Sequence, residues 1–357
     1  MRSSTATGAA SCSPPFHREA VRRQAEQMAE IAAAEVARWP VGREFPVAPR
    51  MSAITLEVIL RIVIGSSDEQ RLSALRRALP PVVDMNLMGT MAMVVPSLGE
   101  LRPWRGIRRA RAEADRLLYA EIAACRADPA LAERTDVLAM LVRATDDGGN
   151  PMSDVELRDQ LMTLLLAGHE TTATGLAWAL ERLVRHPDVL ARAVRAADED
   201  DDKYLDALVR EVLRVRPVIF DVARKLTAPV EIGGHELPAG VLVMPAIGLV
   251  QRSARQYRDP LRFDPERMLW STFTPTTWLP FGGGARRCIG ATFAQVEMRI
   301  VLREILRAVE LTPTAARAER QRAKHVTLVP HRGARVTVHA RRAAQRSVDT
   351  AAAATTA

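Results

Sequence analysis

The sequence predicts a mainly α-helical protein with a small β component. In the first half of the chain, apolar residues recur every three to four positions, which is the spacing of helices that bury one face. Short β-branched segments appear only after Pro217 and again near the carboxyl terminus, where Gly and Pro mark turns. A hydrophobic content of 48% and a charged content of 26% are typical of a globular protein with a sizeable core.

The first helical segments are rich in Ala, Arg and Glu, residues that favour helices. They lie at His17–Arg38, Pro49–Ile64, Glu69–Leu79, Trp104–Cys125 and Asp128–Thr145. Ser153 and Glu156 then have the S-x-x-E spacing of a capping box, which predicts the start of a long helix over about 154–185. We expect the His-Pro pair at 186–187 to end this helix.

A further helix over Lys203–Arg216 ends at Pro217, and the pattern then changes to short strands. The sequence GGHELPAG, at 233–240, predicts a hairpin-like turn between two of these strands. Helix returns over Ala291–Val309. The strands that we expect lie at 222–227, 229–232, 241–244, 326–329 and 334–339.

We expect residues 1–340 to form one domain and residues 341–357 to form a mobile tail, since the tail has almost nothing to bury. The longest nearly apolar runs, 161–168 and 241–250, are far shorter than the ~20 residues that a membrane-spanning helix needs. The first 17 residues lack the continuous apolar segment of a secretory signal. We therefore expect a cytoplasmic protein without a transmembrane segment.

Lys and Arg outnumber Asp and Glu by 50 to 42, and the net charge of +8 favours acidic partners. The few aromatic residues do not interleave with the basic clusters as a base-stacking surface would require, which argues against nucleic acid. The three cysteines, Cys12, Cys125 and Cys288, include no CxxC pair. This argues against a disulfide framework and against a thiolate zinc site.

Polar residues interrupt the apolar 154–185 helix at Gly168, His169, Glu170, Thr171 and Thr172. A glycine and several hydroxyls can let a helix open locally and admit a ligand or water. The alternative is a polar stripe that faces a water pocket. A zinc-protease HExxH motif is excluded, because alanine stands where the second histidine would be.

The segment FGGGARRCIG, at 281–290, is the second candidate site. Its glycines give the backbone freedom, and Cys288 precedes the helix expected from residue 291. We expect the helix dipole and the backbone donors to favour a thiolate, which would be a nucleophile or a metal ligand. The alternative is an inert cysteine that serves as a small core residue, as we expect for Cys12 and Cys125.

Glu211 and Arg214 are three residues apart on one helix face and, taken alone, could form no more than a surface ion pair. Four motifs, however, occur in order: AGHETT, ExxR, DPLRFDPERM at 259–268, and FGGGARRCIG. Together they resemble the cytochrome P450 family of haem-thiolate monooxygenases, over about residues 14–339. The resemblance implies the cytochrome P450 fold.

The resemblance implies a role for each matching residue. Cys288 is the expected thiolate ligand of the haem iron, with Phe281 packed beside the sulfur. Glu170 and Thr171 are the expected acid–alcohol pair that relays protons, and Ala167 and Gly168 leave space for dioxygen. The remaining expected roles are haem-propionate binding by Arg224 and Arg286, and a buried structural triad of Glu211, Arg214 and Arg267.

The resemblance further implies a haem b cofactor and the insertion of one oxygen atom from O2 into a small apolar substrate. Electrons would come from a separate ferredoxin- or flavodoxin-type protein, because no GxGxxG fingerprint of a fused reductase follows a predicted strand. The residues expected to line the substrate pocket are Leu164, Ala167, Val218, Ile219, Phe220 and Val222.

The chain departs from the family pattern at its beginning. PPFH at 14–17 resembles the sequence that follows a family helix with a Trp-x-x-x-Arg motif, and residues 1–13 do not resemble that helix. The expectation is therefore a chain that lacks the amino-terminal part of the family fold. The alternative function is a truncated, non-catalytic remnant that binds haem weakly or not at all.

Overall fold

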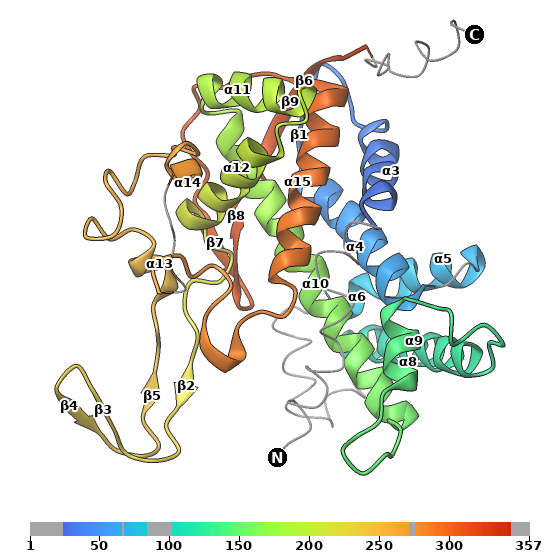
Figure 1. The fold of residues 1–357 in the computed structure, drawn as a ribbon. Helices are drawn as coiled ribbons and strands as arrows, with labels where there is room; N and C mark the ends of the chain where they lie inside the picture. Colours follow the sequence, from blue (N-terminus) through green and yellow to red (C-terminus); the bar gives the residue numbers. More distant parts are fainter. Residues whose placement is uncertain (1–23, 66–67, 84–101, 271–273, 275, 344–357) are drawn as a thin grey trace, which may run out of the picture.

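A computed structural model describes residues 24–65, 68–83, 102–270, 274 and 276–343 (Figure 1). Helix α10, Asp154–Leu183, crosses the middle of the molecule. It begins with the predicted capping box, in which the Ser153 hydroxyl accepts the backbone N–H of Glu156 while the Glu156 carboxylate accepts that of Ser153. Every residue from Thr172 to Leu183 is buried, so α10 is the central helix of the core.

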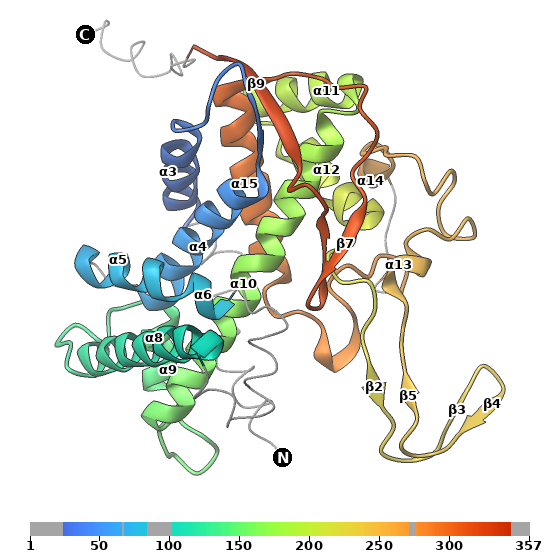
Figure 2. The same ribbon diagram turned by 180° about the vertical axis from the view of Figure 1, so that it is seen from behind.

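The other described helices surround α10 (Figures 1 and 2). Helix α4 makes the most extensive contact with α10, and α15 packs against α3, α11 and α12. The residues expected as helix before Gln24 lie outside the described part of the chain. The helices are α3 (Ala25–Val36), α4 (Ala48–Ile64), α5 (Glu69–Ala78), α6 (Pro80–Val83), α8 (Arg102–Arg126), α9 (Val137–Arg143), α11 (Pro187–Asp198), α12 (Asp202–Val215), α13 (Ile247–Val250), α14 (Arg267–Trp270) and α15 (Ala291–Ala308).

Residues 128–136 form a loop, so the helix predicted over 128–145 is reduced to α9. The Arg134 guanidinium lies 3.1 Å from a carboxylate oxygen of Asp128 and 2.8 Å from one of Asp136. The Asp136 side chain also accepts the backbone N–H of Ala139 at 2.9 Å, as a helix N-cap does. Short acidic side chains that bond to nearby backbone compete with helix, and here they outweigh the helical spacing.

Helix α11 is absent from the prediction, which places only a helix stop at His186 and Pro187. Pro187 does follow the end of α10, but it also occupies the first turn of α11. Its missing N–H costs nothing there, and its fixed φ suits a helix. Leu190, Ala193, Ala196 and Ala197 then bury one face of α11.

Strands β1 (Glu44–Pro46), β9 (Arg335–Arg341) and β6 (Val309–Leu311) form an antiparallel sheet in the order β1-β9-β6. The sequence predicts β9 but neither β1 nor β6. Helix was expected to continue to Val309, but this residue has extended dihedral angles, φ −138° and ψ 149°, and begins the strand. The sheet thus joins the carboxyl end of the chain to the segment between α3 and α4.

Three two-stranded ribbons complete the described β structure: β2 (Arg224–Lys225) with β5 (Leu242–Val243), β3 (Val230–Ile232) with β4 (His235–Leu237), and β7 (Gln321–Lys324) with β8 (Thr327–Pro330). The turn predicted over GGHELPAG is divided in two, at Gly233–Gly234 and at Ala239–Gly240, and the HEL triplet between them forms β4. Strand β7 was not predicted, because QRAK lacks alternating apolar residues. In Figure 1 the first two ribbons extend away from the helices as an arm.

The folded part of the chain extends past residue 340, where the tail was expected to begin. Arg341 is the last residue of β9, and its guanidinium donates to the backbone oxygens of Val36, Ala37 and Trp39 at 2.6–2.9 Å. Arg342 pairs with Asp198 at 2.7 Å. Residues 344–357 of the tail expected over 341–357 lie outside the described residues. Among the described helices, none combines the length and apolar character that crossing a membrane requires.

Candidate active site

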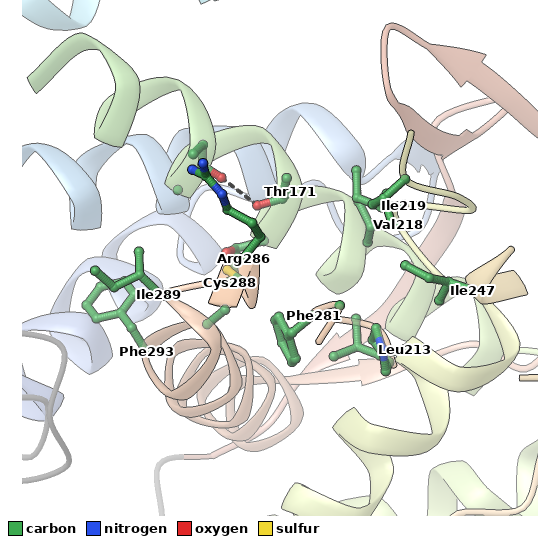
Figure 3. A pocket seen from close by; sticks show the side chains of 18 of the residues that line it. Thr171, Leu213, Val218, Ile219, Ile247, Phe281, Arg286, Cys288, Ile289 and Phe293 are labelled. Carbon is green, nitrogen blue, oxygen red and sulfur yellow. Dashed lines mark hydrogen bonds between the residues drawn. The ribbon is translucent and has the colours of Figure 1, made fainter. Parts of the chain in front are cut away.

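The two candidate motifs meet at one cavity of about 290 Å³ between α10 and the 281–290 loop (Figure 3). Its lining is largely hydrophobic, and its volume is close to the lower end of the range of ~300–1,000 Å³ that is common for ligand pockets. The predicted site residues that line it are Leu164, Ala167, Gly168, Thr171, Val218, Ile219, Val222, Arg224, Phe281, Arg286 and Cys288.

Two of the residues expected at this cavity lie elsewhere. Glu170 faces a second cavity, and Phe220 packs against Gly248 behind the cavity wall. Helical geometry accounts for Glu170, since adjacent residues of a helix point about 100° apart and Thr171 faces the first cavity. Phe220 lies outside the cavity because its ring packs against Gly248, whereas its neighbours Ile219 and Val222 line the cavity.

The loop that carries Cys288 depends on glycines for its shape. Gly282 and Gly284 have φ angles of 68° and 65°, in the left-handed region that side chains disfavour. A short 3₁₀ turn, Gly284–Arg286, follows, and the backbone N–H of Cys288 returns to donate to the Phe281 carbonyl oxygen at 2.9 Å. Gly290 then caps α15. The loop is therefore closed on itself, with Cys288 held at the cavity.

The Cys288 side chain faces the cavity rather than the hydrophobic core, and Figure 3 shows it next to Arg286. Desolvation by the surrounding loop raises the pKa of the thiol above its usual value, although the side chain is exposed at the cavity. The backbone N–H of Gly290 and the charge of Arg287 act in the opposite direction but do not outweigh burial. The thiolate expected at Cys288 therefore stays a prediction.

Arg224 and Arg286 bring positive charge to a cavity that is otherwise apolar. The Arg224 guanidinium donates to the carbonyl oxygen of Ala223, and among the described residues neither arginine pairs with a carboxylate. The donor set consists of one thiol and two guanidinium groups among hydrophobic side chains. It fits a largely apolar ligand that carries a thiol-binding metal and anionic substituents.

The glycine and hydroxyls of α10 could open the helix locally, but they do not. Helix α10 is continuous over its 30 residues. The Thr171 hydroxyl donates to the carbonyl oxygen of Ala167 at 2.6 Å, within the helix. A Cβ atom on Gly168 would lie 2.8 Å from Cδ1 of Ile59 in α4. A side chain at position 168 would therefore have to displace the end of Ile59, at the point where α4 packs against α10.

Glu170 is held on the other side of α10. Its carboxylate lies 3.2 Å from the Lys324 ammonium group and 3.4 Å from the hydroxyl of Thr327, both at the end of the β7–β8 ribbon. These residues border a second cavity of about 610 Å³, which is lined by many polar and charged side chains. Glu170 and Thr171 are thus adjacent in sequence but border different cavities.

Glu211, Arg214 and Arg267 come together below the cavity. Arg214 donates to both carboxylate oxygens of Glu211, at 2.7 and 2.8 Å, and Arg267 lies 3.2 Å from one of them. Glu211 and Arg214 are completely buried. Arg214 also donates to the carbonyl oxygens of Gln251, Pro260 and Arg262. Glu211, Arg214 and Arg267 therefore form a buried network. The alternative, a surface ion pair between Glu211 and Arg214, is wrong.

Several cavity residues were not predicted, because they come from distant segments whose apolar spacing indicates only a core face. Nothing in the sequence distinguishes them from other buried residues of their helices. They are Ile59 in α4, Leu213 in α12, Ile247 in α13, Ile289 in the cysteine loop, and Phe293, Ala294 and Met298 in α15.

Comparison with known proteins gives a single family. Residues 14–338 match the sequence profile of the family described as Cytochrome P450. The chain is 62% identical over 336 residues to a protein of Mycobacterium tuberculosis named cytochrome P450 135B1, an alignment that covers 92% of this chain and 71% of that protein. It is 40% identical over 333 residues to cytochrome P450 138 of Mycobacterium bovis, covering 92% and 75%.

Solved structures show the same similarity. The crystal structure of the cytochrome P450DA heme domain superposes with a TM-score of 0.80 at 29% identity, over 94% of this chain and 77% of that one. The structure of retinoic acid bound cyanobacterial CYP120A1 gives a TM-score of 0.79 at 25% identity, over 94% and 78%.

We predict that Glu211→Ala lowers the free energy of unfolding by about 3–5 kcal/mol, because it leaves Arg214 buried without its charge partner. Denaturant unfolding followed by circular dichroism measures this change. Glu113→Ala is the control, since Glu113 forms an exposed ion pair with Arg116, and it should leave the unfolding midpoint unchanged. Equal midpoints for Glu211→Ala and the control would contradict a structural role of the network.

Proposed function

Since the chain belongs to the cytochrome P450 family of haem-thiolate monooxygenases, we propose that it inserts one oxygen atom of O2 into a small apolar organic molecule. The observation that carries this proposal is the cavity itself, in which a cysteine from the glycine-rich loop faces a hydrophobic chamber bordered by Thr171. The reaction also needs two electrons and two protons, so the chain must accept an electron donor and admit protons.

Haem b is the cofactor that we propose for this cavity. Cys288 would bind the iron, Phe281 would pack beside the sulfur, and Arg224 and Arg286 would bind the two propionates. The haem would supply the activation of dioxygen, promoted by electron donation from the cysteine sulfur. The protein supplies a site whose charges match the iron and the propionates and whose walls are otherwise apolar.

We propose a small, apolar substrate because the cavity residues that are not assigned to the haem are mainly hydrophobic. Leu164 of α10 lies along one wall, and Val218, Ile219 and Val222 form another. Ile247 adds a further apolar side chain. Such a lining binds hydrophobic molecules through burial of apolar surface and offers few groups to orient a polar one.

Protons would enter from the second cavity and pass along α10. The Glu170 carboxylate borders that charged cavity, and Thr171, the next residue, places its hydroxyl at the first cavity. We propose that Glu170 takes up protons on its own side of the helix and that Thr171 Oγ1 presents one inside the first cavity. For this step, Glu170 must leave Lys324 and Thr171 must release the carbonyl of Ala167.

The electron donor that we propose is a separate acidic protein of the ferredoxin or flavodoxin type. Arg287 is exposed on the cysteine loop, next to Cys288, while its neighbour Arg286 lines the cavity. The net charge of +8 would attract an acidic partner toward the chain as a whole. Arg287 is therefore the exposed charge best placed to guide an electron donor to the thiolate side of the haem.

The function is tested at Cys288. In the haem-loaded protein, Cys288→Ser should abolish the Soret band that the reduced carbon-monoxide complex shows in this family, because that band requires a thiolate ligand. Cys125→Ala is the control, since Cys125 is the other free cysteine of the described chain and is buried in the core. A Cys288→Ser protein that keeps the band would refute the assignment, and a native chain that takes up no haem would favour the non-catalytic alternative.

Thr171→Ala should leave folding and haem content nearly unchanged but divert electrons from product to hydrogen peroxide. The change removes the only side-chain hydroxyl assigned here to proton delivery in the cavity. The measurement is the amount of hydrogen peroxide formed per pair of electrons that the electron donor supplies. Thr163→Ala is a matched control on the same helix, because its hydroxyl makes the same kind of bond, to Asp159 at 2.7 Å, on the exposed side. Equal peroxide yields from the two variants would exclude this role for Thr171.

Arg287→Glu should slow reduction by an acidic ferredoxin, on the order of tenfold at low salt, and flatten the dependence of the rate on ionic strength. Haem content should stay the same. Stopped-flow reduction across a salt series measures the effect. Arg109→Glu makes the same charge change at an exposed position of α8. If both variants slow reduction equally, only net charge matters and the docking position is wrong.

A further inference from the structure

One wall of the cavity is suspended between two other elements. The carbonyl oxygen of Val218 accepts the backbone N–H of Leu328 in β8 at 2.8 Å, and that of Phe220 accepts the backbone N–H of Gly248 in α13 at 2.9 Å. The strand residue Leu328 is itself anchored, because its carbonyl oxygen accepts the indole N–H of Trp178 in α10 at 2.8 Å. The wall that carries Val218 and Ile219 is therefore fixed at both edges.

The edge at α13 depends on the absence of a side chain. A Cβ atom on Gly248 would lie 2.1 and 2.2 Å from two ring carbons of Phe220, far inside van der Waals contact. The φ angle of Gly248 is not in the positive region, so its backbone does not require glycine. The space taken by the Phe220 ring is what requires glycine at this position.

The Phe220–Gly248 contact lies directly behind the cavity. Ile219 precedes Phe220 and Ile247 precedes Gly248, and both isoleucines line the cavity although Phe220 and Gly248 do not. In Figure 3, Val218 and Ile219 lie between Thr171 of α10 and Ile247 of α13. Pressure from α13 on this wall is therefore directed toward α10, across the space that a substrate would fill.

We propose that the Phe220–Gly248 contact sets the width of the substrate cavity, so that position 248 determines which apolar molecules fit, although it does not touch them. The inference rests on the proposed function, because it assigns specificity within the proposed substrate site. A side chain at position 248 would push Phe220 and its neighbours toward α10. The cavity would then exclude bulky apolar ligands while still admitting compact ones.

Azole binding to the haem-loaded protein tests this, because azole nitrogen shifts the Soret band when it binds the iron. The probes are imidazole, which is compact, and 4-phenylimidazole, which adds an aromatic ring. Gly248→Ala should weaken 4-phenylimidazole binding about tenfold, equivalent to about 1.4 kcal/mol, and change imidazole binding less than about twofold. The double variant Gly248→Ala/Phe220→Ala should regain the native ratio of the two affinities, because the ring that clashes is gone.

Gly106→Ala is the control for an added methyl group, since a Cβ atom there meets nothing within 4 Å. If Gly248→Ala does not fold, Phe220→Ala alone decides the question. It should strengthen binding of clotrimazole, whose imidazole carries three phenyl rings, relative to imidazole, because the wall can then recede. An unchanged ratio of affinities in the folded variants, or equal weakening of both azoles, would overturn the inference. Failure of the native protein to bind imidazole would instead overturn the proposed function.

Discussion

The buried ion pairs of Glu211 with Arg214 and Arg267 hold together the parts of the chain that form the site. Arg214 collects the carbonyl oxygens of residues 251, 260 and 262, and Arg267 adds those of 258 and 259, so an irregular segment is tied to α12. Tyr257, in the same segment, connects it to the chain before the cysteine loop. Its hydroxyl donates to the carbonyl oxygen of Thr277, four residues before that loop. On the other side, α12 leads directly into the cavity wall at Val218. One charged network thus positions both the loop that carries Cys288 and the cavity wall that carries Val218.

Such a network fixes the position of the chain because buried charged groups are stable in only a few arrangements of their hydrogen-bond partners. A guanidinium group taken out of water needs all its hydrogen bonds satisfied, and the carbonyl oxygens of an irregular segment need donors in the same way. Arg214 meets both needs at once, with Tyr257 stacked 4.8 Å from its guanidinium carbon. Apolar packing alone would allow many arrangements of this segment. The geometry of the hydrogen bonds allows few, and the position of the cysteine loop follows from it.

The sequence predicted most long helices from local patterns, and the resemblance to the family predicted about half of the cavity residues. The capping box at Ser153 and Glu156 places the start of α10 correctly, and the glycine-rich spacing around Cys288 indicates the loop. Failures occurred where a distant contact decides the outcome. Strand β7 forms because β8 is next to it, and the partner of Glu170, Lys324, comes from a segment about 150 residues later.

The same distinction explains the loop before α9 and the position of Phe220. The apolar residues over 128–136 have helical spacing, but Arg134 forms ion pairs with Asp128 and Asp136 that stabilise a loop. The spacing of apolar residues does not predict these ion pairs. Phe220 has the hydrophobic character of a pocket residue, yet Gly248 offers it a better-fitting place. A hydrophobic pattern indicates that a side chain is buried, whereas its partner decides which space it fills.

The sheet that joins β1 to β9 has a consequence for the order in which the protein folds. Glu44 pairs with Thr337, and Arg341 binds the backbone at the end of α3, so contacts close a loop of almost 300 residues. Closing so long a loop is slow, because entropy opposes it until the partners are brought near. During synthesis, β1 therefore stays without its strand partner until residues 335–337 have left the ribosome.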